Sequence, residues 1–367
     1  MSPDSKLTPI DIALELLLAG ISTVEATEEV TLLASKGRVL AKACVAAVSV
    51  PPYDNSAMDG FAVQAKSVQR VPVTLPVSQR IAAGQVGGSL AVGQAARIFT
   101  GAPLPVGADA VVMQENCDYT ENEVTINQAV TSGENVRKRG NDVKSGAKLF
   151  DEGQRLRAQD IGVLASVGVT KVLVRRRLRV ALLTTGDELV QPGIDLQPGQ
   201  IYNSNFFALS ALLQALDCEI INLGVVKDEL AATRHSLLEA AKQADCIIST
   251  GGVSVGEEDH VKAAVTELGA LTLWKLAIKP GKPLAYGTLQ NTHFFGLPGN
   301  PVSAFVTFCL VVRPCLLAMS GCRNAAPLQL RMPAGFALAT TGERQEYLRA
   351  QIVLNSAHLA ELQPTTN

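Results

Sequence analysis

A chain of 367 residues is too long for one compact core, so several domains are expected. The composition, 47% hydrophobic and 18% charged residues, is that of a folded protein, and a formal net charge of −2 gives no electrostatic basis for binding nucleic acid. The seven cysteines form no CxxC pair, and their odd number argues against a complete disulfide framework, so we expect a reduced protein of the cytoplasm.

The N-terminal residues predict a short amphipathic helix rather than a secretory signal. Ile10, Leu14 and Leu17 fall on one helical face, while Asp11 and Glu15 interrupt the apolar run. No other segment approaches the roughly 18 unbroken apolar residues that cross a bilayer. We therefore expect no membrane anchor.

The stretch from Pro51 to Val63, PPYDNSAMDGFAV, predicts a tight turn, because proline fixes φ and Asn, Asp and Ser bond their own backbone. It carries two carboxylates, and the question is whether they only cap the turn or also serve chemistry. Asx side chains commonly cap such turns, which favours a cap for Asp54, but the turn residues alone do not choose between the two carboxylates, Asp54 and Asp59.

Short β-like runs follow at 71–77, 110–113 and 123–126. A helix is predicted at 158–166, with the amphipathic character of the N-terminal helix. We expect these two helices to pack together, with a β-rich piece from 51 to about 140 inserted between them. The basic runs RKRG and RRRLR favour solvated hinges over anion sites.

The second half alternates strands with helices, which predicts βαβ units and a mostly parallel sheet. Strands are expected at 180–184, 219–223, 246–250, 271–276, 284–288 and 293–296, and helices at 204–216, 228–242, 257–268 and 301–319. In such sheets the ligand site lies outside the carboxyl ends of the strands. The loops TTGDEL, STGGVSVGEEDH, KLAIKPGKP and GLPGNPVSAF should therefore converge on one edge.

These four loops suit a phosphorylated ligand with a metal ion. Glycines such as Gly251 and Gly252 let backbone N–H groups approach an anion, and three lysines in one proline-restricted loop could neutralise it. Clustered carboxylates supply the hard oxygen ligands that Mg²⁺ requires. Asn300 or Ser303 can cap the last helix. The carboxylates are Asp187, Glu188, Glu258 and Asp259, and the lysines are Lys275, Lys279 and Lys282.

Each signal has a plainer interpretation when it is taken alone. A glycine turn is as often an ordinary strand-to-helix connection, and an acidic pair after a strand more often complements a helix dipole. The four histidines share no ligand spacing, and there is no nucleophile elbow, HExxH motif or Walker lysine, which weakens a small-molecule kinase interpretation. The residues alone thus predict an α/β domain with an anion-plus-metal site.

Taken together, the motifs are more specific. PPYDNSAMDGFAV, IFTGAPLPVGADAVVMQE, TTGDEL, STGGVSVGEEDHV, IKPGKP and GLPGNPVSAF closely resemble, in order and spacing, the signatures of the molybdopterin molybdenumtransferases, the MoeA family, also seen as the E domain of gephyrin. The resemblance covers essentially the whole chain from Leu7. It implies a multidomain α/β fold with four parts: an elongated helical and β domain (1–50 and 141–176), an inserted β-rich domain (51–140), a three-layer α/β/α, MogA-like domain with a mostly parallel sheet (177–326), and a partial C-terminal β domain (327–367).

The resemblance also implies an activity. An L-shaped homodimer would insert molybdate into adenylylated molybdopterin and release AMP, with Mg²⁺ or another divalent cation and without a protein nucleophile. The cleft would lie between the α/β domain of one subunit and the β-rich domain of the other. The implied further partners are the molybdopterin-adenylylating protein and downstream molybdoenzyme maturation factors, with no nucleic acid and no membrane.

Residue roles follow from the matched motifs. The implied catalytic positions are Asp59, Thr100, Asp142, Glu188, Asp228, Lys275 and Lys279. The implied substrate-binding positions are Ser249, Gly251, Gly252, Ser254, Lys279, Lys282, Pro298, Pro301 and Arg349. The implied cation ligands are Asp187, Glu188 and Asp259.

The last segment departs from the family pattern. GERQEYLRAQIV resembles the family's arginine motif, so Arg344 and Arg349 are candidate molybdate contacts, with Arg349 the better placed. Family members usually continue beyond the point where PTTN ends this sequence, through a serine expected at the molybdate site. The alternative is therefore a catalytically impaired molybdopterin-binding or scaffold protein, although the acidic residues that are present argue against it.

Overall fold

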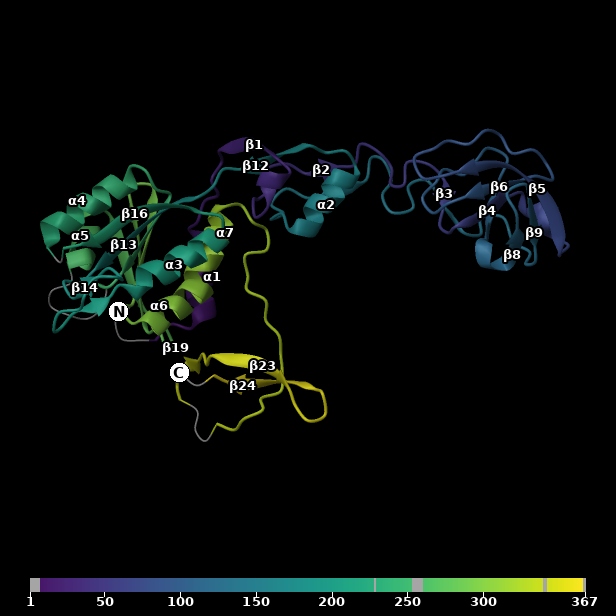
Figure 1. Cartoon of the computed structure of the whole chain (residues 1–367). Coiled ribbons are helices and arrows are strands. Elements are labelled where there is room, and N and C mark those ends of the chain that lie inside the picture. The colour runs from purple at the N-terminus through teal and green to yellow at the C-terminus, as the bar shows by residue number, and fades with distance from the viewer. Residues whose placement is uncertain (1–6, 228, 253–259, 339–341, 366–367) are drawn as a thin grey trace.

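The computed structural model describes residues 7–227, 229–252, 260–338 and 342–365. The molecule is elongated, with an α/β part at one end, a β-rich part at the other, and a slender connecting part between them (Figure 1). A C-terminal hairpin lies beside the α/β part. The chain passes out to the β-rich part and returns before it enters the α/β part, so the β-rich part is an insertion (Figure 1).

The α/β part is built on a six-stranded sheet in the order β16-β13-β17-β21-β20-β18. Strand β20 runs antiparallel to both of its neighbours, and the other five strands share one direction, so the predicted mostly parallel sheet is confirmed. The strands are β13 (Arg179–Thr185), β16 (Glu219–Val226), β17 (Cys246–Thr250), β18 (Ala270–Lys275), β20 (Pro283–Leu289) and β21 (Thr292–Leu297).

Helices cover both faces of this sheet and make three layers (Figure 1). Because side chains alternate along a strand, Val180 and Leu182 of β13 join one core while Ala181 and Leu183 join the other. The first core is shared with α1 (Ile10–Ala19), α3 (Ser204–Ala215), α6 (Pro301–Thr307) and α7 (Arg313–Met319), the last two joined by a π-helical turn, Phe308–Val312. The second core is shared with α4 (Leu230–Ala241) and α5 (His260–Leu268).

One apolar helical stretch bears on the expectation about membrane-spanning segments. Residues Pro301–Met319 are long and apolar enough to cross a bilayer by length and composition. However, 61% of that window is buried, and Phe308, Val312 and Leu316 lie in the core against the sheet. Packing inside the α/β part therefore accounts for its apolar surface.

The predicted packing of the N-terminal helix is wrong. Ala13 and Leu17 of α1 are buried in the α/β core beside α7, whereas Leu164 of α2 (Ala158–Ser166) lies in a separate core in the connecting part. The physical reason is a backbone tie just before α1. The N–H of Thr8 donates to the Lys275 carbonyl (2.8 Å), and the Thr8 carbonyl accepts from the N–H of Ala277 (2.8 Å).

The connecting part holds α2 and two small antiparallel strand pairs. These pairs are β1 (Thr27–Thr31) with β12 (Lys171–Arg175) and β2 (Cys44–Val45) with β11 (Lys148–Phe150). Leu40, Leu156 and Val174 bury the apolar side of this part. Its small core suits a spacer between two larger bodies.

The β-rich part is a six-stranded sheet in the order β7-β4-β6-β5-β9-β8. Strand β4, second from one edge of the sheet, is buried at every position, which anchors the turn that precedes it. The strands are β4 (Gly60–Val63), β5 (Val73–Ile81), β6 (Ala95–Ile98), β7 (Ala110–Met113), β8 (Cys117–Tyr119) and β9 (Glu123–Ile126). A short pair, β3 (Asn55–Ser56) with β10 (Val136–Arg137), joins the entering and leaving chain.

The C-terminal residues form a hairpin of β23 (Ala350–Leu354) and β24 (Ala360–Pro364). Just before it, β22 (Gln345–Glu346) pairs in parallel with β19 (Ile278–Lys279). This pairing attaches the C-terminal segment to the lysine-bearing loop of the α/β part.

Candidate functional site

Three of the four predicted loops meet at the carboxyl ends of β13, β17 and β21. A methyl group placed on Gly251 would lie 2.6 Å from the Thr185 carbonyl oxygen, and one on Gly299 would lie 3.9 Å from the Gly251 Cα. The chain leaves β13 for β16 on one side and later returns to β17 on the other. The loops therefore surround the switch point of the sheet, where open α/β sheets bind ligands.

The backbone at this switch point requires glycine. Gly251 and Gly252 have φ of +84° and +63°, and Val261 and Thr185 leave no room for a side chain at Gly252. Two residues before Gly251, the Ser249 hydroxyl is buried and makes no hydrogen bond among the described residues. The result is a cradle of close backbone and one unsatisfied buried hydroxyl, which suits an anionic or strongly polar ligand.

Asn203 and Asn205, which the motif analysis did not single out, hold this cradle together. The Asn205 amide donates to the Gly299 carbonyl (2.8 Å) and to the Thr250 hydroxyl (3.3 Å), so it bridges two of the loops. The buried Asn203 amide donates to the Thr184 hydroxyl (2.8 Å), and its oxygen caps α3. An Asn-Ser-Asn run at the start of a predicted helix is the signal that could have found them.

The GLPGNP loop ends in a defined cap. Asn300 accepts from the Ser303 N–H (3.1 Å), which settles the choice between the two predicted capping residues in favour of Asn300. Pro301 occupies the first turn of α6, where its missing N–H costs nothing. Pro298 is buried beneath the loop.

The acidic loop after β13 presents Asp187 and Glu188 at the surface. The Glu188 carboxylate folds back beside Gly186, because a methyl group there would meet its Oε2 at 2.5 Å. The strand pair β14 (Leu189–Val190) and β15 (Ile201–Tyr202) closes this loop. The described residues contain no group of three metal-ligating side chains, and the predicted Asp228, Ser254 and Asp259 lie outside the described residues.

The lysine loop lies at the same edge and rests on α6. Gly281, with φ of +108°, approaches the Thr307 hydroxyl so closely that a methyl group there would lie 2.7 Å from it. Lys279 and Lys282 are exposed, and Lys275 is half-buried at the end of β18. Lys279 forms an ion pair with Glu346 (2.9 Å), a partner that the motifs did not predict.

The arginine motif is only partly brought to this edge. The Arg344 guanidinium donates to the Ile278 carbonyl (3.3 Å), next to Lys279. Arg349 is exposed, and its carbonyl accepts from the Thr365 N–H (3.0 Å) at the start of the hairpin.

A second group of predicted residues lies in the β-rich part. The Asp59 carboxylate accepts from both the N–H and the hydroxyl of Thr100, each at 2.8 Å. These two bonds, the backbone one first, lower the pKa of Asp59. The structure thus joins two residues that are 41 positions apart into one ionised, hydrogen-bonded pair.

The other two carboxylates near this turn have structural partners. Asp54 accepts from Lys138 Nζ and from the Arg139 N–H, both at 2.8 Å, and these bonds lower its pKa. Asp142 pairs with Arg137, and its pKa is lowered chiefly by that bond. Asp54 therefore ties the entering turn to the returning chain, more than it caps the turn locally.

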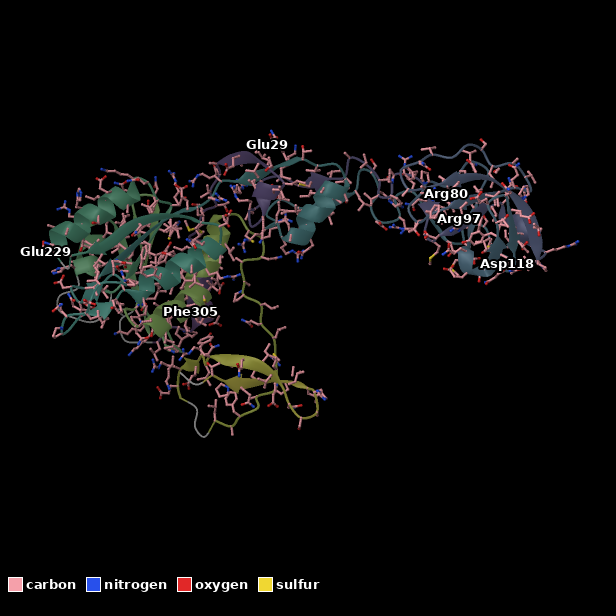
Figure 2. All side chains as sticks on the ribbon, viewed as in Figure 1. Glu29, Arg80, Arg97, Asp118, Glu229 and Phe305 are labelled. Carbon is pink, nitrogen blue, oxygen red and sulfur yellow. The ribbon has the colours of Figure 1, made fainter. Side chains whose placement is uncertain are left out.

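The residues around the glycine cradle and the Asp59–Thr100 pair lie at opposite ends of the molecule. Figure 2 shows Arg97, the β-strand neighbour of the Asp59 turn, at one end and Phe305 of α6 at the other. Within one molecule, the Asp59–Thr100 pair does not meet the glycine cradle or the lysine loop.

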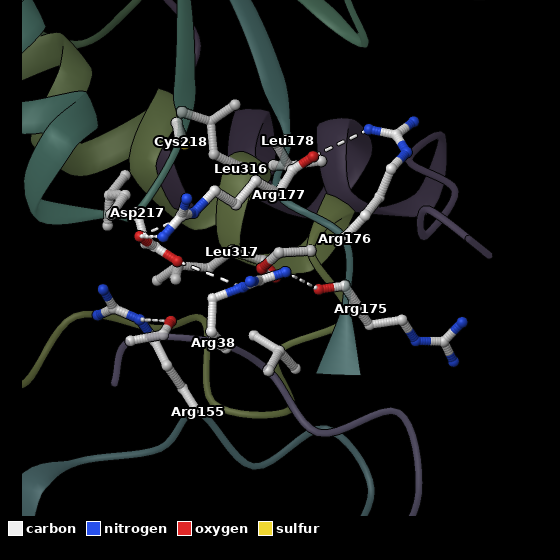
Figure 3. A pocket seen from close by; sticks show the side chains of 14 residues that line it. Arg38, Arg155, Arg175, Arg176, Arg177, Leu178, Asp217, Cys218, Leu316 and Leu317 are labelled. Atoms are coloured by element: carbon white, nitrogen blue, oxygen red, sulfur yellow. Dashed lines mark hydrogen bonds and ion pairs between the residues drawn. The ribbon is translucent and has the colours of Figure 1, made fainter. Parts of the chain in front are cut away.

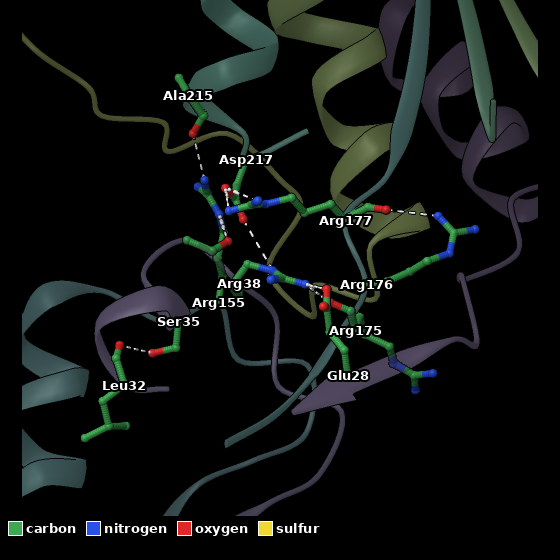
Figure 4. Close-up of polar contacts among 11 residues, drawn as sticks. Glu28, Leu32, Ser35, Arg38, Arg155, Arg175, Arg176, Arg177, Ala215 and Asp217 are labelled. Atoms are coloured by element: carbon green, nitrogen blue, oxygen red, sulfur yellow. Dashed lines mark hydrogen bonds and ion pairs between the residues drawn. The ribbon is translucent and has the colours of Figure 1, made fainter. Parts of the chain in front are cut away.

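The RRRLR run forms the joint between the connecting part and the α/β part. Arg38, Arg155, Arg175, Arg176 and Arg177 line a narrow pocket around Asp217 (Figure 3). Arg38 contacts Asp217 (3.3 Å) and the Arg175 carbonyl (2.8 Å), and Arg177 Nε donates to Asp217 (3.1 Å) (Figure 4). These guanidinium groups have partners within the protein, so the run is a paired joint rather than a solvated hinge.

Comparisons with known proteins agree with the residue motifs. Residues 8–168 match the MoeA N-terminal region (domain I and II), and residues 181–318 match the probable molybdopterin binding domain. Molybdopterin molybdenumtransferase of Haemophilus influenzae is 42% identical over 297 residues, covering 80% of this chain and 73% of that protein. The corresponding Nostoc sp. protein is 39% identical over 342 residues, covering 90% and 78%.

Solved structures give the same result. The molybdopterin biosynthesis MoeA protein of Pyrococcus horikoshii OT3 superposes with a TM-score of 0.81 at 30% sequence identity. The match covers 99% of this chain and 91% of that one.

Proposed function

The chain belongs to the MoeA family of molybdopterin molybdenumtransferases and functions in molybdenum cofactor biosynthesis, and from that premise we propose how its residues carry out the transfer. The reaction inserts molybdate into adenylylated molybdopterin and releases AMP. The observation that carries the proposal is the cradle at the sheet switch point, where Gly251 and Gly252 supply closely packed backbone and Ser249 a buried hydroxyl without a hydrogen-bond partner among the described residues.

The cradle and its neighbours bind the pterin and its phosphate. Lys275, Lys279 and Lys282 lie on the adjoining loop and offset the charge of the phosphoanhydride and of molybdate. In the transfer, a molybdate oxygen attacks the phosphorus of the AMP group, and the anhydride P–O bond to the molybdopterin phosphate breaks. The two dithiolene sulfurs then bind molybdenum and release their protons, while the Mo–O bond of the attacking oxygen breaks. That oxygen leaves in AMP, and molybdenum remains on the dithiolene. No side chain acts as a nucleophile.

The donor set fits a hard divalent cation such as Mg²⁺. Mg²⁺ binds through one or two carboxylates and the substrate's phosphates, and Asp187 and Glu188 present two carboxylates beside the cradle. With Asp259, they would hold the ion. When bound, the cation withdraws charge from the phosphate oxygens.

The active centre is completed by a second copy of the chain. The Asp59–Thr100 pair lies at the far end of the molecule from the cradle, and a homodimer in which each β-rich part faces the partner's α/β part brings the two together (Figure 1). We assign acidic roles in the same reaction to Asp142 and Asp228, and substrate-binding roles to Pro298, Pro301, Ser254 and Arg349, of which Asp228 and Ser254 lie outside the described residues. The enzyme acts in the cytoplasm, between the adenylylating protein and the maturation factors that receive the cofactor.

The test is AMP release from adenylylated molybdopterin by the purified chain, with and without molybdate and Mg²⁺. We expect AMP only when both are present. Binding of adenylylated molybdopterin without any AMP release would refute the proposal in favour of a scaffold role.

A further inference from the structure

Arg97 of β6 is held between aromatic rings beside the Asp59 turn. Its guanidinium carbon lies 5.0 Å from the ring centre of Phe61, 4.9 Å from that of Phe99 and 5.0 Å from that of Tyr119. Stacking of this kind restricts the orientation of the planar guanidinium group. The ring of Phe99 also receives Arg80, whose guanidinium carbon lies 4.5 Å from its centre.

The polar edge of Arg97 bonds to the residue that follows Asp59 and to a residue of a second segment that holds the Asp59 backbone. One terminal nitrogen donates to the Gly60 carbonyl (3.2 Å), and the other donates to the Gln114 side-chain oxygen (2.6 Å). The Gln114 N–H in turn donates to the Asp59 carbonyl (3.1 Å). One guanidinium group therefore fixes the residue after Asp59 and the residue that holds the Asp59 backbone.

The same side chain also braces the donor of the pair. Phe99, which packs on Arg97, directly precedes Thr100, the residue that donates twice to the Asp59 carboxylate. The backbone at Gly60 is tightly packed, because a methyl group there would lie 1.9 Å from the Val112 carbonyl oxygen. A shift of either segment would separate the carboxylate from its donors.

We propose that Arg97 is a positioning residue of the transfer reaction, which holds the Asp59 carboxylate and the Thr100 hydroxyl in the orientation that they present to the partner's cleft. This inference rests on the proposed function of Asp59 and Thr100. A guanidinium group suits the task because its fork bonds two acceptors at once while its face stacks on rings, and lysine can do only part of this.

The test compares three variants of the full-length dimer. R97M removes the fork, and R97K keeps the charge. R80M is the matched control, because Arg80 stacks on the same Phe99 ring but makes no hydrogen bond to the described residues of the Asp59 turn. Steady-state AMP release gives kcat and KM, and NMR titration of the Asp59 carboxyl carbon gives its pKa. Thermal unfolding checks that each variant is folded.

For R97M we expect kcat to fall on the order of 100-fold with KM nearly unchanged, as for a displaced catalytic group. The pKa of Asp59 should rise, because the Thr100 donors that lower it move away and the positive charge of Arg97, which also lowers it, is lost. In R97K, which keeps the charge, a rise reports the loss of positioning alone. R97K should recover part of both values, and R80M should resemble the wild type. A folded R97M with wild-type kcat and an unmoved Asp59 pKa overturns the proposal.

If R97M does not fold, Q114L decides, because it removes the Arg97 partner and leaves the aromatic stack intact. A lowered kcat and a raised Asp59 pKa in Q114L support the proposal, and wild-type values overturn it. The test also separates the two proposals. If the wild type releases no AMP, the proposed function fails, while the Asp59 pKa in R97K and R80M still tests the positioning role.

Discussion

The two ends of the molecule hold their polar groups in different ways. At the α/β end, glycines with positive φ and crowded Cβ positions bring the backbone itself to the ligand site. At the β-rich end, a strand pair presents a side-chain carboxylate, and another side chain fixes it. The first arrangement suits recognition of a large polar ligand, and the second suits one defined charge. Neither end holds both the backbone cradle and the fixed carboxylate. For this reason we propose that two copies of the chain form the active centre.

The largest expected effect comes from substitutions that inactivate one end of the molecule at a time. Asp59→Asn and Glu188→Gln should each lower AMP release on the order of 100-fold or more, because each removes a charge aimed at the reacting groups. Mixing the two variants under conditions that exchange subunits should restore activity. Half of the dimers are then mixed and each has one intact site, so about one quarter of wild-type activity is expected.

Measurement of AMP release before and after subunit exchange checks this prediction. The control is a mixture of Asp59→Asn with Thr100→Val, a variant first checked to be folded. Both changes lie in the β-rich part, so each site of a mixed dimer contains one altered β-rich part and no site is intact. If the mixture of Asp59→Asn and Glu188→Gln contains heterodimers but regains no activity, the assignment of each active centre to two copies of the chain is wrong.

The next effect tests whether the α/β cradle depends on its backbone. Gly251→Ala and Gly84→Ala make a matched pair, since their φ values are +84° and +85°. Both should lose about 1–2 kcal/mol of unfolding free energy from left-handed strain. Only Gly251→Ala also pushes a methyl group against the Thr185 carbonyl, because Gly84 has open space around it.

We therefore expect Gly251→Ala to lose more stability than Gly84→Ala and to lose binding of molybdopterin. Denaturant unfolding and fluorescence titration with molybdopterin measure the two effects. Equal losses in both variants, with binding retained, would show that the crowding at Gly251 does not shape the ligand site.

The sequence predicts the helices and strands of the α/β end better than it predicts which parts of the molecule pack together. Buried runs such as CIIST and the helix at 158–166 match β17 and α2 at their bounds, because local periodicity decides them. The rule that ligands bind at the carboxyl ends of strands also selects four loops, three of which the structure brings together at that edge. An amphipathic face, in contrast, does not say which apolar surface will cover it, so α1 was assigned to the wrong partner.

Contacts between distant segments explain what motif analysis missed. Asn205 bridges to Gly299, Glu346 pairs with Lys279, and Arg97 reaches the Asp59 turn through strand pairing. Nothing local in the sequence marks Glu346 or Arg97 as part of a site, and only the Asn-Ser-Asn run at the start of α3 points to Asn205. Asp59 and Thr100 could be named only because the family resemblance links their two motifs.

A smaller effect concerns the joint that sets the distance between the two ends. Arg176 donates twice to Asp245, each bond 2.7 Å, and the Arg179 N–H adds a third. Burial raises the pKa of Asp245, but these bonds outweigh it and the pKa is lowered overall. Asp245→Asn should cost about 2 kcal/mol of unfolding free energy at pH 7, since hydrogen bonds to a charged group are lost.

The pH dependence has a defined sign. The carboxylate stabilises the folded state fully above the pKa of an unfolded Asp, about 3.9, and this stabilisation is lost as the pH falls through the lower folded value. The difference between wild type and Asp245→Asn should therefore shrink below about pH 4. Urea unfolding at several pH values measures it, with the exposed Glu239–Lys242 pair as the control, where Glu239→Gln should change little.

The smallest effect separates the two carboxylates of one turn. Asp54→Asn removes the ion pair with Lys138 but keeps an oxygen that can accept from the Arg139 N–H. Exposed pairs of this kind contribute at most about 1 kcal/mol, so stability should fall by less than that and AMP release should persist. Asp59→Asn, five residues later in the same turn, should stop the reaction without unfolding the protein. If Asp54→Asn abolished activity as completely, the whole turn rather than one carboxylate would be the functional unit of the β-rich end.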